Sequence, residues 1–196
     1  LEGGVHWGVG LLGDLVSHWE KRNIEAVQTY DPRKIDTTEM ARLLEEHGQR
    51  LIELGSSVEG GVAASAFAQA GPFDDFEHVG AACAEDIADR FVPNFYFGCE
   101  ADDPLAAWAF ADQINPLGAR LRAMLGSDIA HWDVTDMTLP VEEAWEMVER
   151  GTLGPAEFRE FAFTNAVRLH AGMNPDFFAG TTVEGAVVEA LEKDLG

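Results

Sequence analysis

A carboxylate and an imidazole lie three residues apart in the segment that reads Leu125-Gly-Ser-Asp128-Ile-Ala-His131-Trp132-Asp133. The segment follows a short apolar run, so Gly-Ser-Asp would stand at the end of a strand. In α/β enzymes the chemistry is carried by the carboxyl ends of parallel strands, at the mouth of the sheet or barrel. Asp128 and His131 are side chains that can bind a divalent cation or exchange a proton there.

The residues alone leave other roles open. Aspartate is common at loop starts because its side chain hydrogen-bonds the local backbone, so Asp128 can also be a turn residue. His131 either orients Asp128 or touches a substrate, or it is a partly exposed loop histidine bonded to backbone. Cys99 and Glu100 follow an aromatic run and should face the same mouth. A free cysteine is more typical of a small buried residue than of a site.

This run resembles the eighth-strand signature of the metal-dependent amidohydrolases, in the branch that contains aminocarboxymuconate-semialdehyde decarboxylase. That branch typically carries Ser-Asp, two variable residues and His-Trp-Asp, which here is the run from Ser127 to Asp133. Three other parts of the chain are similar to the family in the same order. They are Glu2 to Trp7, Asn94 to Glu100, and the stretches Phe161 to Asn165 and Asn174 to Thr181. The resemblance covers most of the chain except residues 24 to 90.

The resemblance implies a (β/α)₈ TIM barrel in which Asp128 binds the catalytic metal and acts as general base, with His131 as a further catalytic residue. Glu2 stands where relatives carry a sixth-strand histidine, so it is either a substitute acid, base or ligand, or a carboxylate bonded to the glycines that follow. The implied cofactor is a divalent metal, zinc in the first place, although carboxylate and imidazole ligands suit Mn and Fe as well. The implied activity is hydrolysis of a small carboxylic or aromatic compound, with nonoxidative decarboxylation as the alternative.

Family members also carry a His-x-His pair after the first strand and a metal-binding histidine after the fifth, and the chain holds neither segment. We therefore expect residues 1–196 to be the C-terminal portion of one α/β barrel domain, rich in helix, with about three parallel strands and a helical and loop insertion over residues 24–90. Unpaired strand edges would drive association with the missing N-terminal half or with other copies as a homo-oligomer. The competing hypothesis is an inactive structural fragment or partner subunit.

Composition favours an ordinary folded protein, with 46% hydrophobic and 10% aromatic residues. The 35 acidic residues against 13 basic ones give a net charge of −22, which disfavours binding to nucleic acid or to an anionic membrane surface. No apolar stretch approaches the roughly 18 residues of a membrane span, and no signal peptide is visible at the start. Two cysteines without other extracellular signals are expected to be free thiols, so we predict a cytoplasmic location.

Hydrophobic periodicity predicts the elements that would position these residues. Asn94 to Gly98 and Leu121 to Leu125 are expected to pair as parallel strands, with a helix over 104–114 across them that Asp103 caps. Helix should greatly exceed strand. The other expected helices cover residues 7–22, 36–54 with Asp36 as cap and Gly55 as stop, 82–90, 140–148, 155–169 with a bend, and 184–195.

Overall fold

The computed structural model of the chain describes residues 3–27, 31, 34–50 and 76–194. The chain divides into two compact units, one of residues 1–16 with 83–196 and one of residues 17–82. Helices dominate the described residues, and a small parallel sheet lies in the first unit. This composition of elements agrees with the α/β class expected from the sequence.

The sheet consists of β1 (Tyr96–Glu100) and β2 (Arg122–Gly126), which pair in parallel. Tyr96 lies opposite Arg122 and Glu100 lies opposite Gly126. The predicted parallel pairing is confirmed. The first strand begins two residues later than predicted, because Val92–Asn94 form a 3₁₀ turn (η4) around Pro93. Because both strands end at the same edge, the segments that follow them meet there.

The connection between the strands differs from the expected α-helix over 104–114. Pro104–Phe110 form a 3₁₀ helix (η5) that Asp103 caps as predicted, with Asp103 Oδ1 accepting from the Leu105 N–H at 2.9 Å. The helix ends early because outside groups take its last carbonyls. Asn115 Nδ2 donates to the Trp108 carbonyl at 2.7 Å, and the Leu121 N–H donates to the Ala109 carbonyl at 2.8 Å. A short 3₁₀ turn, Pro116–Gly118 (η6), leads into β2.

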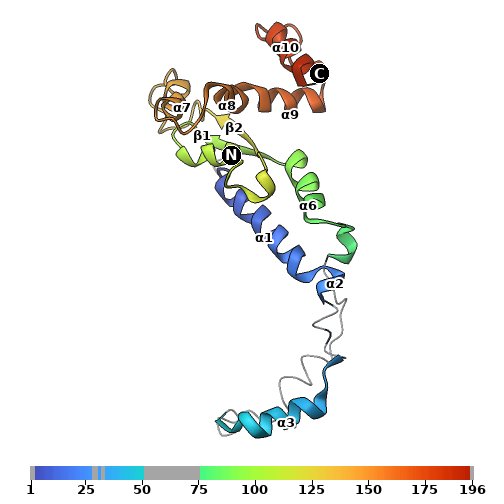
Figure 1. Ribbon diagram of the computed structural model, residues 1–196. Coiled ribbons are helices and arrows are strands. Elements are labelled where there is room, and N and C mark those ends of the chain that lie inside the picture. Colours follow the sequence, from blue (N-terminus) through green and yellow to red (C-terminus); the bar gives the residue numbers. More distant parts are fainter. Residues whose placement is uncertain (1–2, 28–30, 32–33, 51–75, 195–196) are drawn as a thin grey trace. The chain divides into compact units, whose positions relative to one another are not determined.

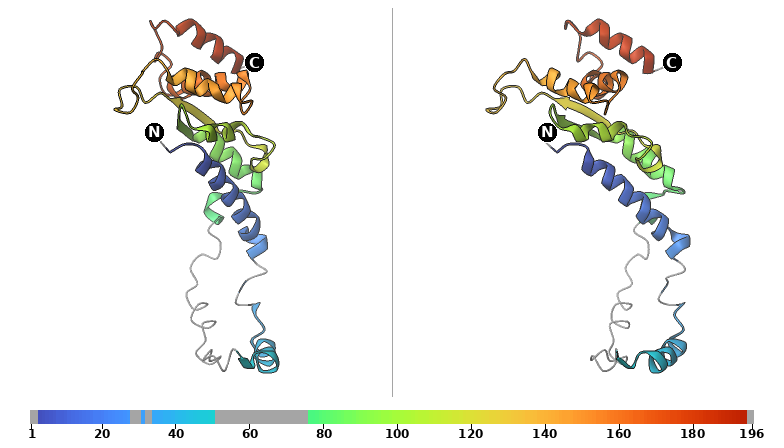
Figure 2. Two further views of the ribbon diagram at one scale, coloured as in Figure 1. Left: turned by 90° about the vertical axis from the view of Figure 1, so that its left-hand side faces the viewer. Right: turned by 60° about the vertical axis from the view of Figure 1, so that its left-hand side comes forward.

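Helices cover both faces of the sheet (Figures 1 and 2). On one side lies α1 (His6–Arg22), whose Gly8 packs against the ring of Phe97. On the other side lie α8 (Pro155–Arg159) and α9 (Asn165–Met173), and buried Asn165 donates through Nδ2 to the Ala123 carbonyl of β2 at 2.9 Å. The core therefore lies above and below two short strands.

A turn of π-helix, Glu160–Thr164 (η7), joins α8 to α9 and accounts for the bend that the sequence predicted between residues 155 and 169. It carries Phe161, one of the largest fully buried side chains. The other helices of this unit match their predicted positions within about two residues. They are α6 (Ala84–Phe91), α7 (Pro140–Glu149) and α10 (Glu184–Asp194). In Figures 1 and 2, α9 lies between the sheet and α10.

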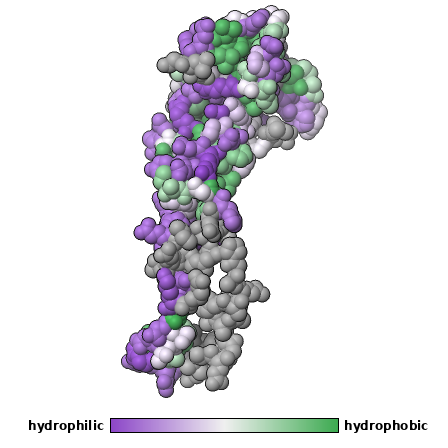
Figure 3. Space-filling view, turned by 90° about the vertical axis from the view of Figure 1, so that its right-hand side faces the viewer, coloured by the Kyte–Doolittle hydropathy of each residue, from purple (hydrophilic) through white to green (hydrophobic). Residues whose placement is uncertain are grey.

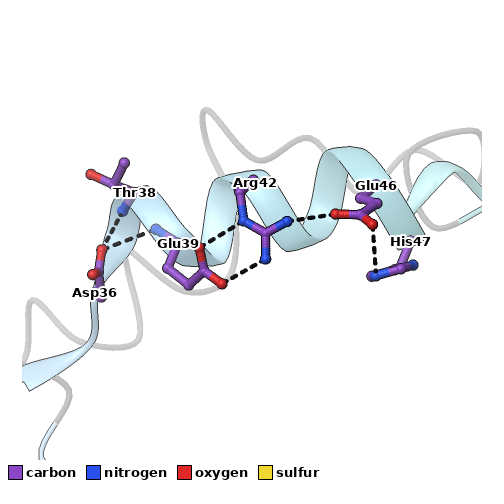
Figure 4. Close-up of polar contacts among 6 residues, drawn as sticks. All are labelled: Asp36, Thr38, Glu39, Arg42, Glu46 and His47. Atoms are coloured by element: carbon purple, nitrogen blue, oxygen red, sulfur yellow. Dashed lines mark hydrogen bonds and ion pairs between the residues drawn. The ribbon is translucent and has the colours of Figure 1, made fainter.

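The second unit contains α2 (Ile24–Val27), α3 (Thr37–His47) and a 3₁₀ turn, η3 (Glu77–Val79). Asp36 caps α3 as predicted, with Oδ1 accepting from the Thr38 and Glu39 N–H groups (Figure 4). This helix ends at His47, and the Gly48 N–H bonds the Leu44 carbonyl. The predicted stop at Gly55 lies outside the described residues. Arg42 pairs with Glu39 and Glu46 along its exposed side (Figure 4).

Two further expectations concern the number of strands and the insertion. The described residues contain two of the about three strands that the sequence predicted, Gly3 and Gly4 lead into α1 by a turn, and residues 1–2 before them lie outside the described part. The predicted insertion over residues 24–90 overlaps the second unit, residues 17–82, whereas α6 belongs to the first unit. Its central residues, 51–75, lie outside the described part. Among the described residues, no helix combines the length and the apolar character needed to cross a bilayer.

The close approach of α1 to β1 predicts opposite effects for two glycines of the same helix. A Cβ at Gly8 would lie 2.5 Å and 2.7 Å from Cε1 and Cζ of Phe97, a ring that is itself buried, whereas a Cβ at Gly10 would meet nothing within 4 Å. We expect Gly8→Ala to lower the free energy of unfolding by about 1–3 kcal/mol through overpacking. Gly10→Ala should raise it by about 0.5–1 kcal/mol through helix propensity. Urea unfolding measures both, and equal effects would contradict this packing.

Candidate metal centre

The loop after β2 folds back on itself directly beyond the strand. The His131 N–H donates to the Asp128 carbonyl at 3.0 Å, which closes a four-residue turn. Asp128 has φ 48° and Ala130 has φ 80°, both in the left-handed region. Aspartate tolerates this region better than most residues. Ala130 occupies the third position of the turn, where a positive φ favours glycine. The turn brings the side chains of Asp128 and His131 to the same side.

Three side chains of this loop converge on one point. His131 Nδ1 lies 3.1 Å from Asp128 Oδ2 and 2.5 Å from Asp133 Oδ1. One donor atom from each of the three residues lies within 4.8 Å of the others. The hydrogen bond with His131 lowers the pKa of the Asp133 carboxyl. All three side chains are 40–53% exposed, so a solute can reach them.

The side-chain donor atoms of these three residues suit a divalent cation. Two carboxylates and one imidazole are ligands that zinc accepts, and Mn and Fe accept them too. Three protein ligands with access for a further molecule are typical of catalytic rather than purely structural sites. In the structure the imidazole lies between the two carboxylates, so the cluster can also work without a cation, with His131 holding Asp128 in place. Asp128 and His131 thus lie together, as the sequence predicted.

A hollow of about 310 Å³ opens beside the cluster, at the carboxyl ends of both strands. Its wall is strongly acidic and comes from three elements: the segment after β1, the loop after β2, and the start of α7. Its acidic lining residues are Glu100, Asp102, Asp128, Asp133, Asp136 and Glu143. Glu100 therefore faces the same edge as Asp128, as expected from the strand ends.

Asp133 is the site residue that sequence reasoning did not select. Its signal was available, since it closes the His-Trp-Asp end of the run and follows His131 by two residues. The sequence spacing did not indicate that acidic residues of α7 and of the segment before it would line this hollow. They come close to it only because the chain folds back after the loop. Among these, Asp136 serves a turn: its Oδ1 accepts from the N–H and the hydroxyl of Thr138, and these bonds lower its pKa.

Another candidate, Glu2, lies outside the described residues, so the structure gives no position for it. Cys99 is 1% exposed, so its thiol lies in the core. Burial raises the pKa of the Cys99 thiol to about 12, so it stays protonated at neutral pH. Cys99 is therefore a packing residue, and both it and the exposed Cys83 are free thiols.

Comparison of the chain with protein-family models, with curated proteins and with solved structures finds no match. The geometry of the loop after β2 is therefore the basis for assigning a function.

The turn at Ala130 supplies a test of this loop's backbone. Ala130→Gly should raise the free energy of unfolding by about 0.5–1 kcal/mol, because glycine adopts a φ of 80° without steric cost. Ala119, at φ −66°, provides the matched control, and Ala119→Gly should lower the free energy of unfolding by a similar amount. Urea unfolding followed by circular dichroism measures both. Destabilisation by both variants would show that Ala130 does not adopt this turn.

Proposed function

We propose that the chain is part of a metal-dependent hydrolase of the amidohydrolase type. The observation that carries the proposal is the convergence of Asp128, His131 and Asp133 at the carboxyl end of a parallel strand, beside an open hollow. Active sites of parallel α/β folds lie at this end of the sheet. The amidohydrolase resemblance of the sequence assigns a metal-binding aspartate to the position of Asp128, which agrees with that placement.

In this proposal Asp128, His131 and Asp133 hold one divalent cation, zinc in the first place. A bound cation supplies Lewis-acid polarisation of a substrate oxygen. Asp128 would take up the proton of the attacking water. Without a cation, the contact with His131 fixes the orientation of Asp128, and the hydrogen bond with His131 lowers the pKa of the Asp133 carboxyl.

The lining of the hollow restricts the substrate. Its described residues include six carboxylates and neither lysine nor arginine. A small carboxylic compound would be repelled from this wall unless a cation neutralised part of the charge. A metal-dependent reaction on a small organic compound therefore suits the hollow better than a metal-free one.

The cysteines bear on the cellular location. Cys83 is exposed and free, which suits a reducing compartment such as the cytoplasm.

Zinc titration tests the metal centre directly. Isothermal titration calorimetry of the chain should show weak binding of about one equivalent, because three exposed donors make an incomplete site. Asp128→Asn should weaken this binding about tenfold or more while leaving thermal unfolding in place, since it removes one charged ligand from an exposed loop. Asp112→Asn removes the same charge from an exposed residue that does not line the hollow, and it should have no effect.

Unchanged zinc affinity in Asp128→Asn would exclude the metal role of Asp128. The reaction itself is tested on the complete polypeptide that we propose, with a panel of small amides, esters and carboxylic acids followed by NMR. Hydrolysis gives two products from one amide or ester, whereas decarboxylation releases carbon dioxide, so the two activities are distinguishable. Metal-loaded protein that converts none of them would argue for a structural fragment or partner subunit.

The sheet supports a role for further strands. Parallel sheets are normally larger and covered on both faces, and a two-stranded sheet is a small core for this unit. Apolar areas lie on the surface among hydrophilic ones (Figure 3). Large exposed hydrophobic side chains in the first unit include Trp7, Phe95, Trp108, Ile114 and Trp132. We propose that part of this surface packs against the remaining barrel or against other copies.

Association is the expected outcome for the chain alone. Size-exclusion chromatography with light scattering should give a mass above the 21.3 kDa of one chain, because exposed apolar side chains and open strand edges favour self-association. The isolated chain should also show no hydrolase turnover. A well-behaved monomer that holds one equivalent of zinc tightly and hydrolyses a substrate would contradict the incomplete-barrel proposal.

A further inference from the structure

The segment that carries the metal centre also exposes large apolar side chains. Trp132 is 85% exposed, the highest fraction among the large apolar side chains of the part of the chain that the structure describes. Single exposed apolar residues are common on protein surfaces, but several along one segment beside a candidate site indicate a contact surface. We call those of this segment the apolar rim: Ile129, Trp132, Met137, Leu139 and Val141.

Successive turns before α7 keep the apolar rim away from the core. The His131 N–H bonds the Asp128 carbonyl, and the Val134 N–H then bonds the His131 carbonyl at 3.3 Å. A third turn closes where the Leu139 N–H bonds the Asp136 carbonyl at 3.2 Å. A segment that reverses this often forms no helix or strand with one face to bury. The turns that bring the metal donors together therefore also leave these apolar side chains at the surface.

The apolar rim and the metal donors lie close together. The ring centres of Trp132 and His131 are 6.3 Å apart, and His131 Nδ1 lies 3.1 Å from Asp128 Oδ2. Leu139 belongs to the apolar rim and also lines the acidic hollow, together with Val134. A substrate whose reacting group is held at the donors therefore extends over the apolar rim once it is larger than a few atoms.

The shape and charge of these surroundings restrict the class of substrate. The apolar rim follows the chain from the loop after β2 to the first turn of α7, so it suits an extended apolar group better than a compact ring. The carboxylates that line the hollow repel an anionic group and can only accept hydrogen bonds. A secondary amide suits such a wall, because it is neutral and its N–H is a donor.

We propose that the substrate is a neutral secondary amide with an extended apolar chain, and that Trp132 determines this specificity by contacting the chain. The position of the amide rests on the proposed hydrolase function, whereas contact between the chain and the apolar rim requires no metal. The indole of Trp132 offers a large rigid face with only two torsions to fix, so little conformational entropy is lost in this contact.

N-hexylacetamide is the probe. Saturation-transfer NMR with the full chain and no added metal should show it binding at least about tenfold more tightly than N-methylacetamide, because buried methylenes add to the affinity. N-benzylacetamide, which carries a compact ring, and the hexanoate anion should both bind more weakly than N-hexylacetamide. The indole N–H signal of Trp132 should shift during the titration.

Variants locate the contact. Trp132→Ala should weaken N-hexylacetamide binding at least about fivefold and remove most of its advantage over N-methylacetamide. Trp132→Phe keeps an aromatic face and should fall between the two. Met173→Ala truncates an apolar side chain that is 70% exposed at the end of α9, outside the apolar rim, and should leave the affinity unchanged. Circular dichroism checks that each variant folds, and Trp132→Phe decides if Trp132→Ala does not.

Several results would overturn the inference. They are N-hexylacetamide binding no better than N-methylacetamide, N-benzylacetamide binding more tightly than N-hexylacetamide, and Met173→Ala weakening binding as much as Trp132→Ala. Another is a Trp132→Ala chain whose mass by light scattering falls while its N-hexylacetamide affinity stays the same, since Trp132 would then belong to a contact between copies.

A separate zinc titration distinguishes this inference from the proposed function. A chain that binds N-hexylacetamide at Trp132 but no zinc would refute the metal centre and leave the apolar contact in place. A chain that binds zinc through Asp128 but not N-hexylacetamide would refute only the assignment of the substrate class.

Discussion

The parallel pairing of β1 with β2 is the constraint on which the first unit depends. The register sets Tyr96 beside Arg122 at one end and Glu100 beside Gly126 at the other. Five residues per strand are therefore enough to separate two chemically different ends. The acids that follow the strands gather at the carboxyl end, and Arg122 and Arg168 gather at the amino end. With an antiparallel pairing, each end of the sheet would instead combine the start of one strand with the end of the other.

Both faces of this short sheet need close contacts to stay ordered. On one face the missing side chain of Gly8 lets α1 approach the Phe97 ring. On the other face Asn165 bonds the Ala123 carbonyl of β2, so a buried polar side chain fixes the position of α9 against the strand. An unpaired buried amide is costly, so this bond favours one arrangement of helix and strand over its neighbours. The orientation of Arg168, whose Nη1 donates to Asn165 Oδ1 at 3.0 Å, follows from it.

The sequence predicted the positions of helices and strands along the chain better than it predicted which distant segments lie close together in space. Periodicity, Pro93 and the Asp103 cap located two parallel strands and most helices, because these signals act within a few residues. The early end of η5 could not be predicted, since Asn115 and Leu121 bond its last carbonyls from outside the helix. Asp128 and His131 were found together because both belong to one four-residue turn. The acidic wall from α7 depends on the path of the chain after that turn, and local patterns do not determine that path.

The π turn at Glu160–Thr164 acts as a phase adjustment between α8 and α9. A π turn accommodates one residue more than the α-helix would hold in the same length. Removing one residue there would let the helix continue in regular α geometry, and everything beyond would rotate by about 100° around the helix axis. Asn165 would then turn away from β2, and Arg168 would turn with it. The angular setting of one entire face of the unit is thus encoded by a single extra residue.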